Sequence, residues 1–257
     1  MEAPLRGIRV LVTRAAESGG ELARELERRG ATVRNVPLIR IGPPPSEREL
    51  QAAVDAADDC DWIVFASVNG VRSFCARRST PLPPRVRVAA IGSTTAQAAR
   101  EELDISDVVA PAHFVAEELA DEVLHQAAPG SSVLVIQAAD ARPALAARLR
   151  AGRMRVTTIA AYSTVAIAPE DLSLRVKDCD VVTLASASAV RSLVAGLGGK
   201  THAPLHLRGK LVTCIGGVTE LEAREHGVHV ELVPPHATVE SLVDALCAYY
   251  SASQSEA

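Results

Sequence analysis

No long hydrophobic run occurs in this sequence of 257 residues. Its apolar segments stay well short of the roughly 18–20 residues that a helix needs to span a bilayer. The first residues, Met1–Arg6, do not place an apolar stretch after a basic one, which is the pattern of a secretory signal. We therefore expect a cytoplasmic protein that does not associate with a membrane.

Several chemical signatures are also missing. The five cysteines form no CxxC pair, which argues for free thiols and against a disulfide framework. The sequence has no GxGxxG after its first strand, no GxxxxGK[ST] phosphate loop, no GxSxG elbow and no HExxH pair. The net charge of −4 argues against nucleic-acid binding. Dinucleotide, nucleotide, serine-hydrolase and zinc-protease chemistry are therefore all disfavoured.

Lysine is scarce, and arginine supplies nearly all of the positive charge. The 27 basic residues include only the lysines Lys177, Lys200 and Lys210. Such a bias indicates either recognition of oxyanions, because the guanidinium fork matches a carboxylate, or a GC-rich coding sequence.

A long internal repeat is the most informative feature that is present. Residues 61–74, Asp-Trp-Ile-Val-Phe-Ala-Ser-Val-Asn-Gly-Val-Arg-Ser-Phe, return at 180–193 as Asp-Val-Val-Thr-Leu-Ala-Ser-Ala-Ser-Ala-Val-Arg-Ser-Leu. Ala90–Thr95 similarly returns at Cys214–Thr219. A period of about 120 residues is too long for a solenoid and matches a small domain, so two similar domains are expected.

Strand and helix patterns alternate along the chain, which indicates an α/β fold. Residues 8–13 and 31–36 are suited to buried parallel strands, and Ser18 is expected to cap the helix between them. The same strand–helix–strand pattern recurs with strands at 132–136 and 154–160. The other expected strands lie at about 61–66, 86–91, 105–109, 180–184, 211–215 and 229–233, and residues 251–257 are expected to be a disordered tail.

Each repeat contains an extended segment, 37–41 in the first and 162–167 in the second. The copies could fold in tandem, or they could exchange their strand–helix–strand units. Exchange is favoured because linkers usually mark domain boundaries, and these segments lie inside the repeats. The predicted fold is α/β, with two similar, pseudo-duplicated parallel-sheet domains joined by a two-stranded antiparallel linker. The predicted boundaries are 1–36 with 168–257 for a discontinuous first domain, 43–160 for the second, and 37–42 and 161–167 for the connecting strands.

Small, mostly hydroxyl-bearing loops follow the predicted strands. In parallel sheets, ligands bind at the carboxyl ends of strands, where helix N-termini offer free N–H groups to anions. Such loops are also ordinary helix caps, but their number favours a small-molecule site in a cleft between the domains. The loops are 13–15, 67–70, 92–95, 137–140, 186–188 and 216–219.

An ordered set of short motifs resembles the uroporphyrinogen-III synthase family over about residues 7–249. The set comprises Val-Leu-Val-Thr-Arg at 10–14, Pro-Leu-Ile at 37–39, Phe-x-Ser-x-x-Gly-Val at 65–71, Ile-Gly-x-x-Thr at 91–95 and 215–219, and Tyr162. The resemblance implies two α/β domains joined by a two-stranded ladder. It also implies ring closure of linear hydroxymethylbilane with inversion of ring D and loss of water, without a metal or organic cofactor.

The resemblance likewise implies partners and localisation. The expected substrate is a polycarboxylate linear tetrapyrrole, and a transient contact with the upstream enzyme that makes it is conceivable. We expect a cytoplasmic monomer of tetrapyrrole biosynthesis that binds neither nucleic acid nor membrane. The other hypothesis is a catalytically silent two-domain protein that binds or senses a tetrapyrrole.

Tyr162 is the expected catalytic residue, assisting departure of the substrate hydroxyl. Alternatively, its ring packs against the connector and its hydroxyl makes a structural hydrogen bond. Arg14 is expected to bind substrate, although a surface salt bridge would also explain it. The other expected substrate-binding residues are Ser67, Asn69, Thr95, Ser186, Ser188 and Thr219.

Two departures from the family pattern weaken the individual hydroxyl assignments. The family often has Phe-Thr-Ser where this chain has Phe-Ala-Ser at 65–67 and Leu-Ala-Ser at 184–186. In addition, Gly217 stands where a proline is common.

Overall fold

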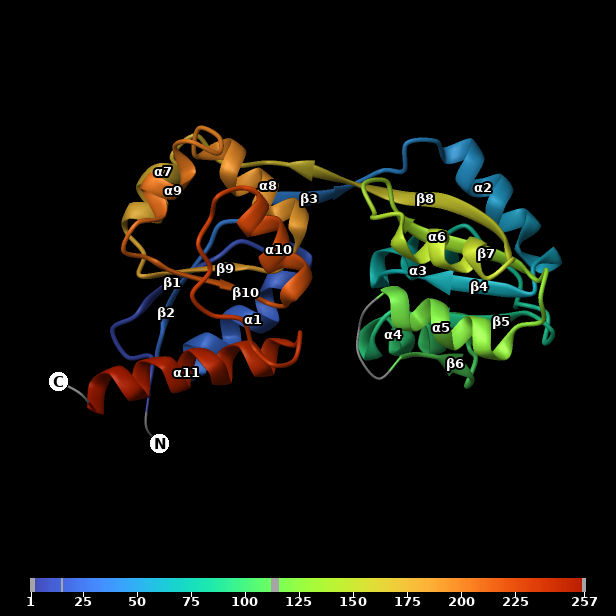
Figure 1. Ribbon diagram of the computed structural model, residues 1–257, viewed down its shortest axis with the longest axis horizontal. Coiled ribbons are helices and arrows are strands. Elements are labelled where there is room, and N and C mark those ends of the chain that lie inside the picture. Colours follow the sequence, from blue (N-terminus) through green and yellow to red (C-terminus); the bar gives the residue numbers. More distant parts are fainter. Residues whose placement is uncertain (1–2, 15, 112–115, 256–257) are drawn as a thin grey trace. The chain divides into compact units, whose positions relative to one another are not determined.

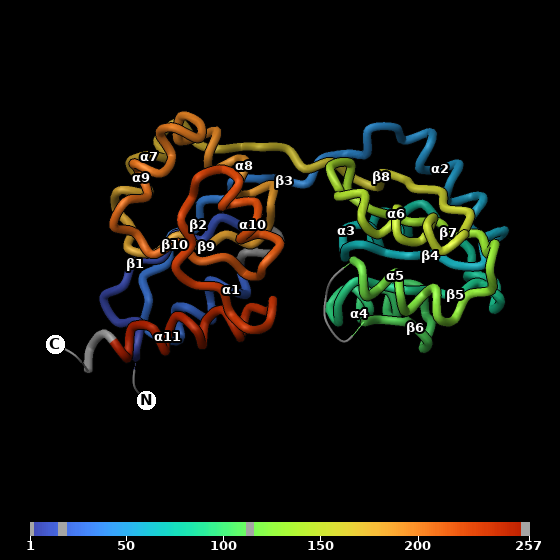
Figure 2. The backbone as a smooth tube through the Cα atoms, in the orientation of Figure 1, coloured from blue at the N-terminus to red at the C-terminus, as the bar shows by residue number. Residues whose placement is uncertain are grey.

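The computed structural model describes residues 3–14, 16–111 and 116–255. The chain divides into two compact units (Figure 1). Unit 1 combines Met1–Arg40 with Val165–Ala257, and unit 2 is Ile41–Thr164. In Figure 2 the blue start of the chain therefore shares a unit with its orange and red end, while cyan to yellow form the other. That each unit is an independent domain with the boundaries given above stays a prediction.

Unit 1 is built on a four-stranded sheet with all neighbours parallel. The strand order is β10 (Leu211–Cys214), β9 (Val181–Leu184), β1 (Arg9–Val12) and β2 (Thr32–Asn35). Its helices are α1 (Ala16–Arg28), α7 (Leu172–Lys177), α8 (Ala187–Gly196), α9 (Ala203–Leu207), α10 (Gly217–Glu225) and α11 (Val239–Ser255).

Unit 2 holds most of a six-stranded sheet. The order is β3 (Ile39–Gly42), β8 (Arg155–Ala166), β7 (Ser132–Ala138), β4 (Trp62–Phe65), β5 (Arg87–Ala90) and β6 (Val108–Val109). The neighbours from β8 to β6 are parallel. The helices are α2 (Glu47–Asp55), the 3-10 helix η1 (Ala56–Asp59), α3 (Val68–Cys75), α4 (Ser93–Leu103), α5 (Ala116–Gln126) and α6 (Ala144–Ala151).

Strand β3 and the end of β8 pair in antiparallel fashion. The amide of Ile167 donates to the carbonyl oxygen of Leu38, and the Ser163 hydroxyl donates to the carbonyl oxygen of Pro43. From Leu38 to Pro43 the chain runs forward, while the bonded residues run backward from Ile167 to Ser163. This order is that of an antiparallel pair.

The two sheets repeat one another in register. In unit 1, Val10 pairs with Val181. In unit 2, the repeat-equivalent residues Val133 and Trp62 pair in the same way. The outer pairings correspond too. Arg9 pairs with Thr32 as its counterpart Ser132 pairs with Arg155. Leu211 pairs with Val181 as Arg87 pairs with Trp62. The strand orders β10-β9-β1-β2 and β5-β4-β7-β8 are therefore one arrangement built twice, and the predicted fold class is confirmed.

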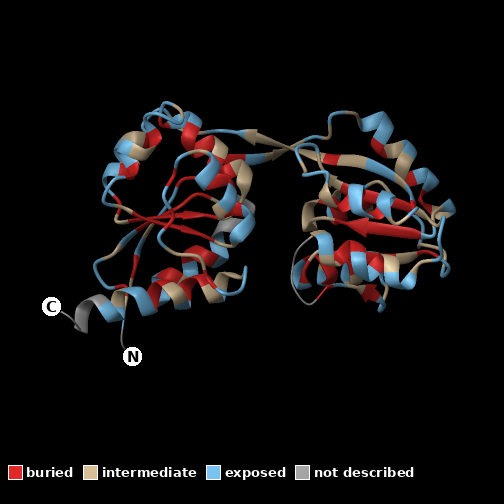
Figure 3. Cartoon of the chain, in the orientation of Figure 1, coloured by how far each residue is buried: buried red, intermediate tan, exposed pale blue. Residues whose placement is uncertain are grey.

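Each sheet is covered on both faces, so its central strands are buried throughout (Figure 3). In unit 2, Ile63 and Phe65 pack with α2, α3 and α4 on one face, while Trp62 and Val64 pack with α5 and α6 on the other. Burial on both faces explains why these strands read as unbroken apolar runs. Within the described part of the chain, no helix is long and apolar enough to cross a membrane.

Four local predictions are wrong. Strand 154–160 and connector 162–167 form the single strand β8, because no glycine or proline interrupts them. Helix α1 begins at Ala16, since Ala16 and Glu17 extend it past the expected cap at Ser18. The expected strand 229–233 is reduced to an isolated bridge at Leu232, because two prolines follow.

The fourth concerns the expected tail. Helix α11 continues to Ser255, within the segment 251–257 that was expected to be disordered. The earlier turns of this helix bury Leu242, Val243 and Leu246 against unit 1, which anchors the residues that follow.

Candidate functional site

Each sheet gathers three of the predicted loops at one edge. In unit 2 the strands β7, β4 and β5 are parallel neighbours, so the loops 137–140, 67–70 and 92–95 start from the same edge. In unit 1 the corresponding strands are β1, β9 and β10. Their loops are 13–15, whose last residue lies outside the described residues, 186–188 and 216–219.

Tyr162 and Ser67 meet at the unit-2 edge. The Tyr162 hydroxyl donates to Ser67 Oγ over 3.0 Å, from strand β8 to the N-cap of α3. Burial raises the pKa of Tyr162 above its ordinary value, Asp140 adds to the rise, and the hydrogen bonds that Tyr162 shares with Ser67 and Asn69 act in the opposite sense. The phenol is therefore protonated at neutral pH and acts as a hydrogen-bond donor.

Among the described residues, the Ser67 hydroxyl accepts two hydrogen bonds and has no acceptor for its own hydrogen. A serine hydroxyl has one donor and two acceptor sites. Ser67 Oγ accepts from Tyr162 and from the Gly70 amide at 3.1 Å, so both acceptor sites are used. Its own hydrogen is left to donate outward. The pair can thus pass a proton from Tyr162 through Ser67 to a third oxygen.

Ser186 is the unit-1 counterpart of Ser67. It caps α8 by accepting from the Ala189 amide at 3.1 Å. Its second contact is Ser188, with the two hydroxyl oxygens 3.3 Å apart. Ser188 occupies the position of Asn69 in the repeat. The structure thus brings Ser186 and Ser188 together as one hydroxyl pair beside a helix N-terminus.

Thr95 and Thr219 are equivalent residues in the first turns of α4 and α10. They lie where the repeat predicts, but their exposed fractions are only 6% and 4%. A ligand at either turn would therefore meet mainly the backbone N–H groups of the helix N-terminus.

Arg14 follows β1 at the unit-1 edge and is partly buried. Burial lowers the pKa of its guanidinium, while Glu21 acts in the opposite sense. Among the side chains that the structure describes, no carboxylate lies close enough to form an ion pair with Arg14. A partly desolvated guanidinium is well suited to an incoming carboxylate.

Potential metal ligands do not cluster in the described ranges, where no three His, Cys, Asp or Glu side chains could hold an ion together. The five cysteines are free thiols. Burial raises the pKa of Cys75 and Cys179 to about 11, which makes both poor nucleophiles.

A crevice of about 270 Å³ also opens in unit 2. It lies beside the N-terminus of α2, and Tyr162 is not among the residues that line it. The lining residues are Pro45, Ser46, Glu49, Gln137, Ala138, Ala139, Thr158, Ile159 and Ala160. Of the predicted loops, only 137–140 reaches it.

Sequence reasoning missed the contacts of two repeated aspartates at the amino ends of the central strands. The Asp61 carboxylate accepts from the Ser132 amide at 2.7 Å, and its counterpart Asp180 accepts from the Arg9 amide at 2.9 Å. Each contact fixes the start of a central strand. The repeated Asp was visible in the sequence, and so was the repeated Arg-Ser at 72–73 and 191–192. Each of these residues recurs at the same separation as the rest of the repeated segment, and this equal spacing could have identified them.

A sequence model of a protein family, HEM4, described as uroporphyrinogen-III synthase HemD, matches residues 20–244. A porphyrin biosynthesis protein HemD of Ruminiclostridium josui is 29% identical over 96% of this chain, which spans about half (49%) of that relative. The uroporphyrinogen-III synthase of Synechococcus elongatus is 26% identical, over 95% of this chain and 96% of its own.

Solved structures agree on the fold. A mutant uroporphyrinogen III synthase from the extremely thermophilic bacterium Thermus thermophilus superposes with a TM-score of 0.67 at 19% identity, over 97% of this chain and 100% of that one. The Helicobacter pylori synthetase gives 0.61 at 13% identity, over 96% and 99%. Likeness at such identities concerns the fold alone, whereas the sequence model covers most of the chain. From that match, this chain belongs to the uroporphyrinogen-III synthase family.

Proposed function

We propose that this chain is a uroporphyrinogen-III synthase, which closes hydroxymethylbilane to uroporphyrinogen III with inversion of ring D and loss of water. Membership of the family and the similarity to the Synechococcus enzyme support this function. The observation that carries it is the hydroxyl pair of Tyr162 and Ser67 at the carboxyl edge of the unit-2 sheet.

Departure of the substrate hydroxyl is the step assigned to this pair. Ser67 donates its proton to the leaving oxygen and takes one from Tyr162, the carbon–oxygen bond breaks, and water leaves. The pyrrole nitrogen supplies electrons to the carbon, which gives an azafulvenium cation. For ring D to invert, its α-carbon that already carries a bridge attacks this cation, and the old bridge bond then breaks to leave a second azafulvenium cation on the neighbouring ring. The free α-carbon of ring D attacks that second cation, and its proton is lost as the pyrrole regains aromaticity. That proton restores Tyr162, so one proton is delivered and one returned.

Binding of the substrate carboxylates falls to the remaining predicted residues. The first turns of α3, α4, α8 and α10 place backbone N–H groups and the positive end of the helix dipole at the carboxyl edges of the two sheets. Arg14 adds a guanidinium that lacks an ion-pair partner among the described side chains. Ser188 adds a hydroxyl at the carboxyl edge of the unit-1 sheet, and Asn69 adds an amide at that of unit 2. These groups position a flexible polycarboxylate, and positioning alone removes much of the barrier to ring closure.

The proposal extends to the class of enzyme and its setting. We assign a hydro-lyase reaction without a metal or organic cofactor. Loss of water followed by ring closure changes no oxidation state, so the reaction requires no redox cofactor. A cytoplasmic monomer that meets its upstream enzyme only transiently is the form we expect.

The decisive experiment supplies hydroxymethylbilane and separates the product isomers. Hydroxymethylbilane closes without enzyme to the type I isomer. We expect the type III isomer to dominate when the protein is present. If the product stays type I at all protein concentrations, the synthase hypothesis is wrong and the silent binding protein is favoured. No feature of the site specifically supports that alternative.

Replacing Tyr162 by Phe tests the catalytic assignment. The variant removes the phenol hydroxyl but keeps the buried ring, so we expect the fold to survive and kcat to fall at least about tenfold. Tyr249→Phe is the matched control, because Tyr249 lies on α11 in unit 1 and should leave kcat unchanged. Full activity of Tyr162→Phe would confine Tyr162 to a structural role.

A further inference from the structure

Strand β8 contains one extra residue immediately before Tyr162. Gln137 of β7 pairs with Ala160, but the next residue, Ala138, pairs with Tyr162. Ala161 is therefore the additional residue of a β-bulge. Bulges leave a residue outside the ladder and can re-aim the side chain that follows.

The bulge decides which face of the sheet carries Tyr162. Side chains alternate along a strand, so Ile159 and Ala161 share the face that packs against α3. Without the extra residue, Tyr162 would point to the opposite face, with α5 and α6. With it, Tyr162 also packs on the α3 face, within reach of Ser67.

A serine of α3 holds the bulged peptide. Ala161 is 1% exposed, and a buried carbonyl outside the ladder must find another donor. Ser73 supplies it, with its hydroxyl donating to the Ala161 carbonyl oxygen over 2.6 Å. Helix α3 therefore contacts the strand twice, through Ser73 on the peptide before Tyr162 and through Ser67 on the Tyr162 hydroxyl.

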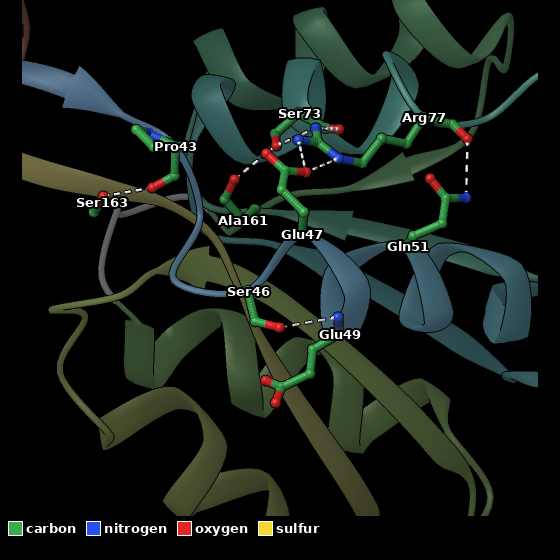
Figure 4. A network of polar contacts seen from close by, with 9 residues as sticks. All are labelled: Pro43, Ser46, Glu47, Glu49, Gln51, Ser73, Arg77, Ala161 and Ser163. Carbon is green, nitrogen blue, oxygen red and sulfur yellow. Dashed lines mark hydrogen bonds and ion pairs between the residues drawn. The ribbon is translucent and has the colours of Figure 1, made fainter.

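Arg77 fixes the direction of the serine hydroxyl (Figure 4). Its Nη1 donates to Ser73 Oγ at 3.0 Å and to the Ser73 carbonyl oxygen at 2.7 Å. Arginine has no acceptor, so the hydrogen of Ser73 must point elsewhere, toward Ala161. Glu47, the first residue of α2, in turn accepts from Arg77 Nη2 at 2.6 Å and Nε at 3.1 Å.

Unit 1 repeats the serine and its contact with the strand carbonyl, but not the arginine or the tyrosine. Ser192 donates to the Leu38 carbonyl oxygen over 2.6 Å, but Leu38 also accepts from the Ile167 amide at 3.0 Å. The repeat places Gly196 where unit 2 has Arg77, and Ile39 where it has Tyr162. At this repeat position, the unit that carries the tyrosine has the guanidinium and the other unit has a glycine.

We propose that Ser73, oriented by Arg77 and Glu47, is a positioning residue that holds the bulge at Ala161 and so aims the Tyr162 hydroxyl at Ser67, the residue assigned to protonate the leaving oxygen. This inference rests on the role given to Tyr162 in the proposed function. It assigns Ser73 no contact with substrate.

A double-mutant cycle tests it. Ser73→Ala should lower kcat about tenfold with KM nearly unchanged, because a small displacement of a reacting group is costly. Ser73→Thr, which keeps the hydroxyl, should restore most of the rate. In the Tyr162→Phe background, Ser73→Ala should have almost no further effect on kcat, because the group that it aims is already missing.

Two other variants sharpen the result. Arg77→Met leaves the Ser73 hydroxyl but frees its direction, and should cost about threefold in kcat, again only when Tyr162 is present. Ser192→Ala is the matched control, since Leu38 keeps its second donor, and should leave kcat unchanged.

Tyrosine labelled with ¹³C at Cζ gives a readout apart from activity. The Tyr162 signal, identified by its loss in Tyr162→Phe, should shift in Ser73→Ala and stay in place in Ser192→Ala. An unchanged Tyr162 signal, or an equal fall in kcat with and without Tyr162, would overturn the proposal. Full activity of Tyr162→Phe would instead count against the catalytic assignment, and absence of type III product against the proposed function.

Discussion

The two units share a sheet arrangement and differ in what they place at its carboxyl edge. Both hold the start of a central strand through an aspartate, Asp61 in unit 2 and Asp180 in unit 1. Both cap the helix after that strand with a serine. The unit-2 copy brings a tyrosine to its serine, whereas the repeat has Ile39 at the tyrosine position in unit 1. The repeated residues build the scaffold, whereas Tyr162, to which we assign the catalytic role, is not repeated.

The largest effects should come from the central strands. Phe65 and Leu184 are equivalent and fully buried. Phe65→Ala should lower the free energy of unfolding by about 3–5 kcal/mol and Leu184→Ala by about 2–5 kcal/mol. The loss should be greater at Phe65, whose ring also meets Phe74 edge-on with centroids 5.6 Å apart. Urea unfolding curves would measure both, and a larger loss at Leu184 would show that the aromatic pair adds nothing.

Intermediate effects are expected at the helix caps. Ser67→Ala and Ser186→Ala each remove a cap and should cost about 1 kcal/mol of stability. Activity should separate them, because Ser67 also receives the Tyr162 hydroxyl, and kcat should fall further in Ser67→Ala. Thermal melts would give the first quantity and isomer-resolved assays the second. Equal kcat values would mean that the Tyr162–Ser67 contact is structural.

The smallest effects should come from the strand-start aspartates, and they depend on pH. Hydrogen bonds from Ser132 depress the pKa of Asp61, and those from Arg9 depress that of Asp180. A carboxylate with a depressed folded pKa stabilises the protein above its unfolded pKa and loses that contribution as pH falls through the folded value. Asp61→Asn and Asp180→Asn should therefore be less stable than the native protein at pH 7 and match it in strong acid.

Salt should distinguish the two aspartates. Asp180 faces the charged Arg9 side chain at 2.7 Å, whereas the carboxylate of Asp61 accepts from uncharged groups of Ser132. Added salt screens exposed ion pairs, so it should shrink the effect of Asp180→Asn more than that of Asp61→Asn. Unfolding at low and high ionic strength would check this, and an equal response would mean that the Arg9 charge contributes little.

Much of the fold could be predicted because the repeat constrains it twice. Apolar runs gave the central strands, and the matched spacing gave two equivalent sheets. The candidate site was less accessible. The loops at 67–70 and 186–188 were found as helix caps, but the Tyr162–Ser67 contact depends on the bulge at Ala161. Whether Tyr162 faces α3 or α6 depends on one extra residue in the ladder, which periodicity within β8 does not reveal. Arg77 was missed for a similar reason, because it lies outside the repeated motif.

The division of unit 1 into Met1–Arg40 and Val165–Ala257 also has a consequence for how the chain is made. Strand β1 is synthesised well before one of its two neighbours, β9, which emerges some 170 residues later. Unit 2 is synthesised without interruption and can complete its own core first. During that interval the β9 flank of β1 lacks its strand, which leaves a row of unpaired backbone groups open to pairing with other chains.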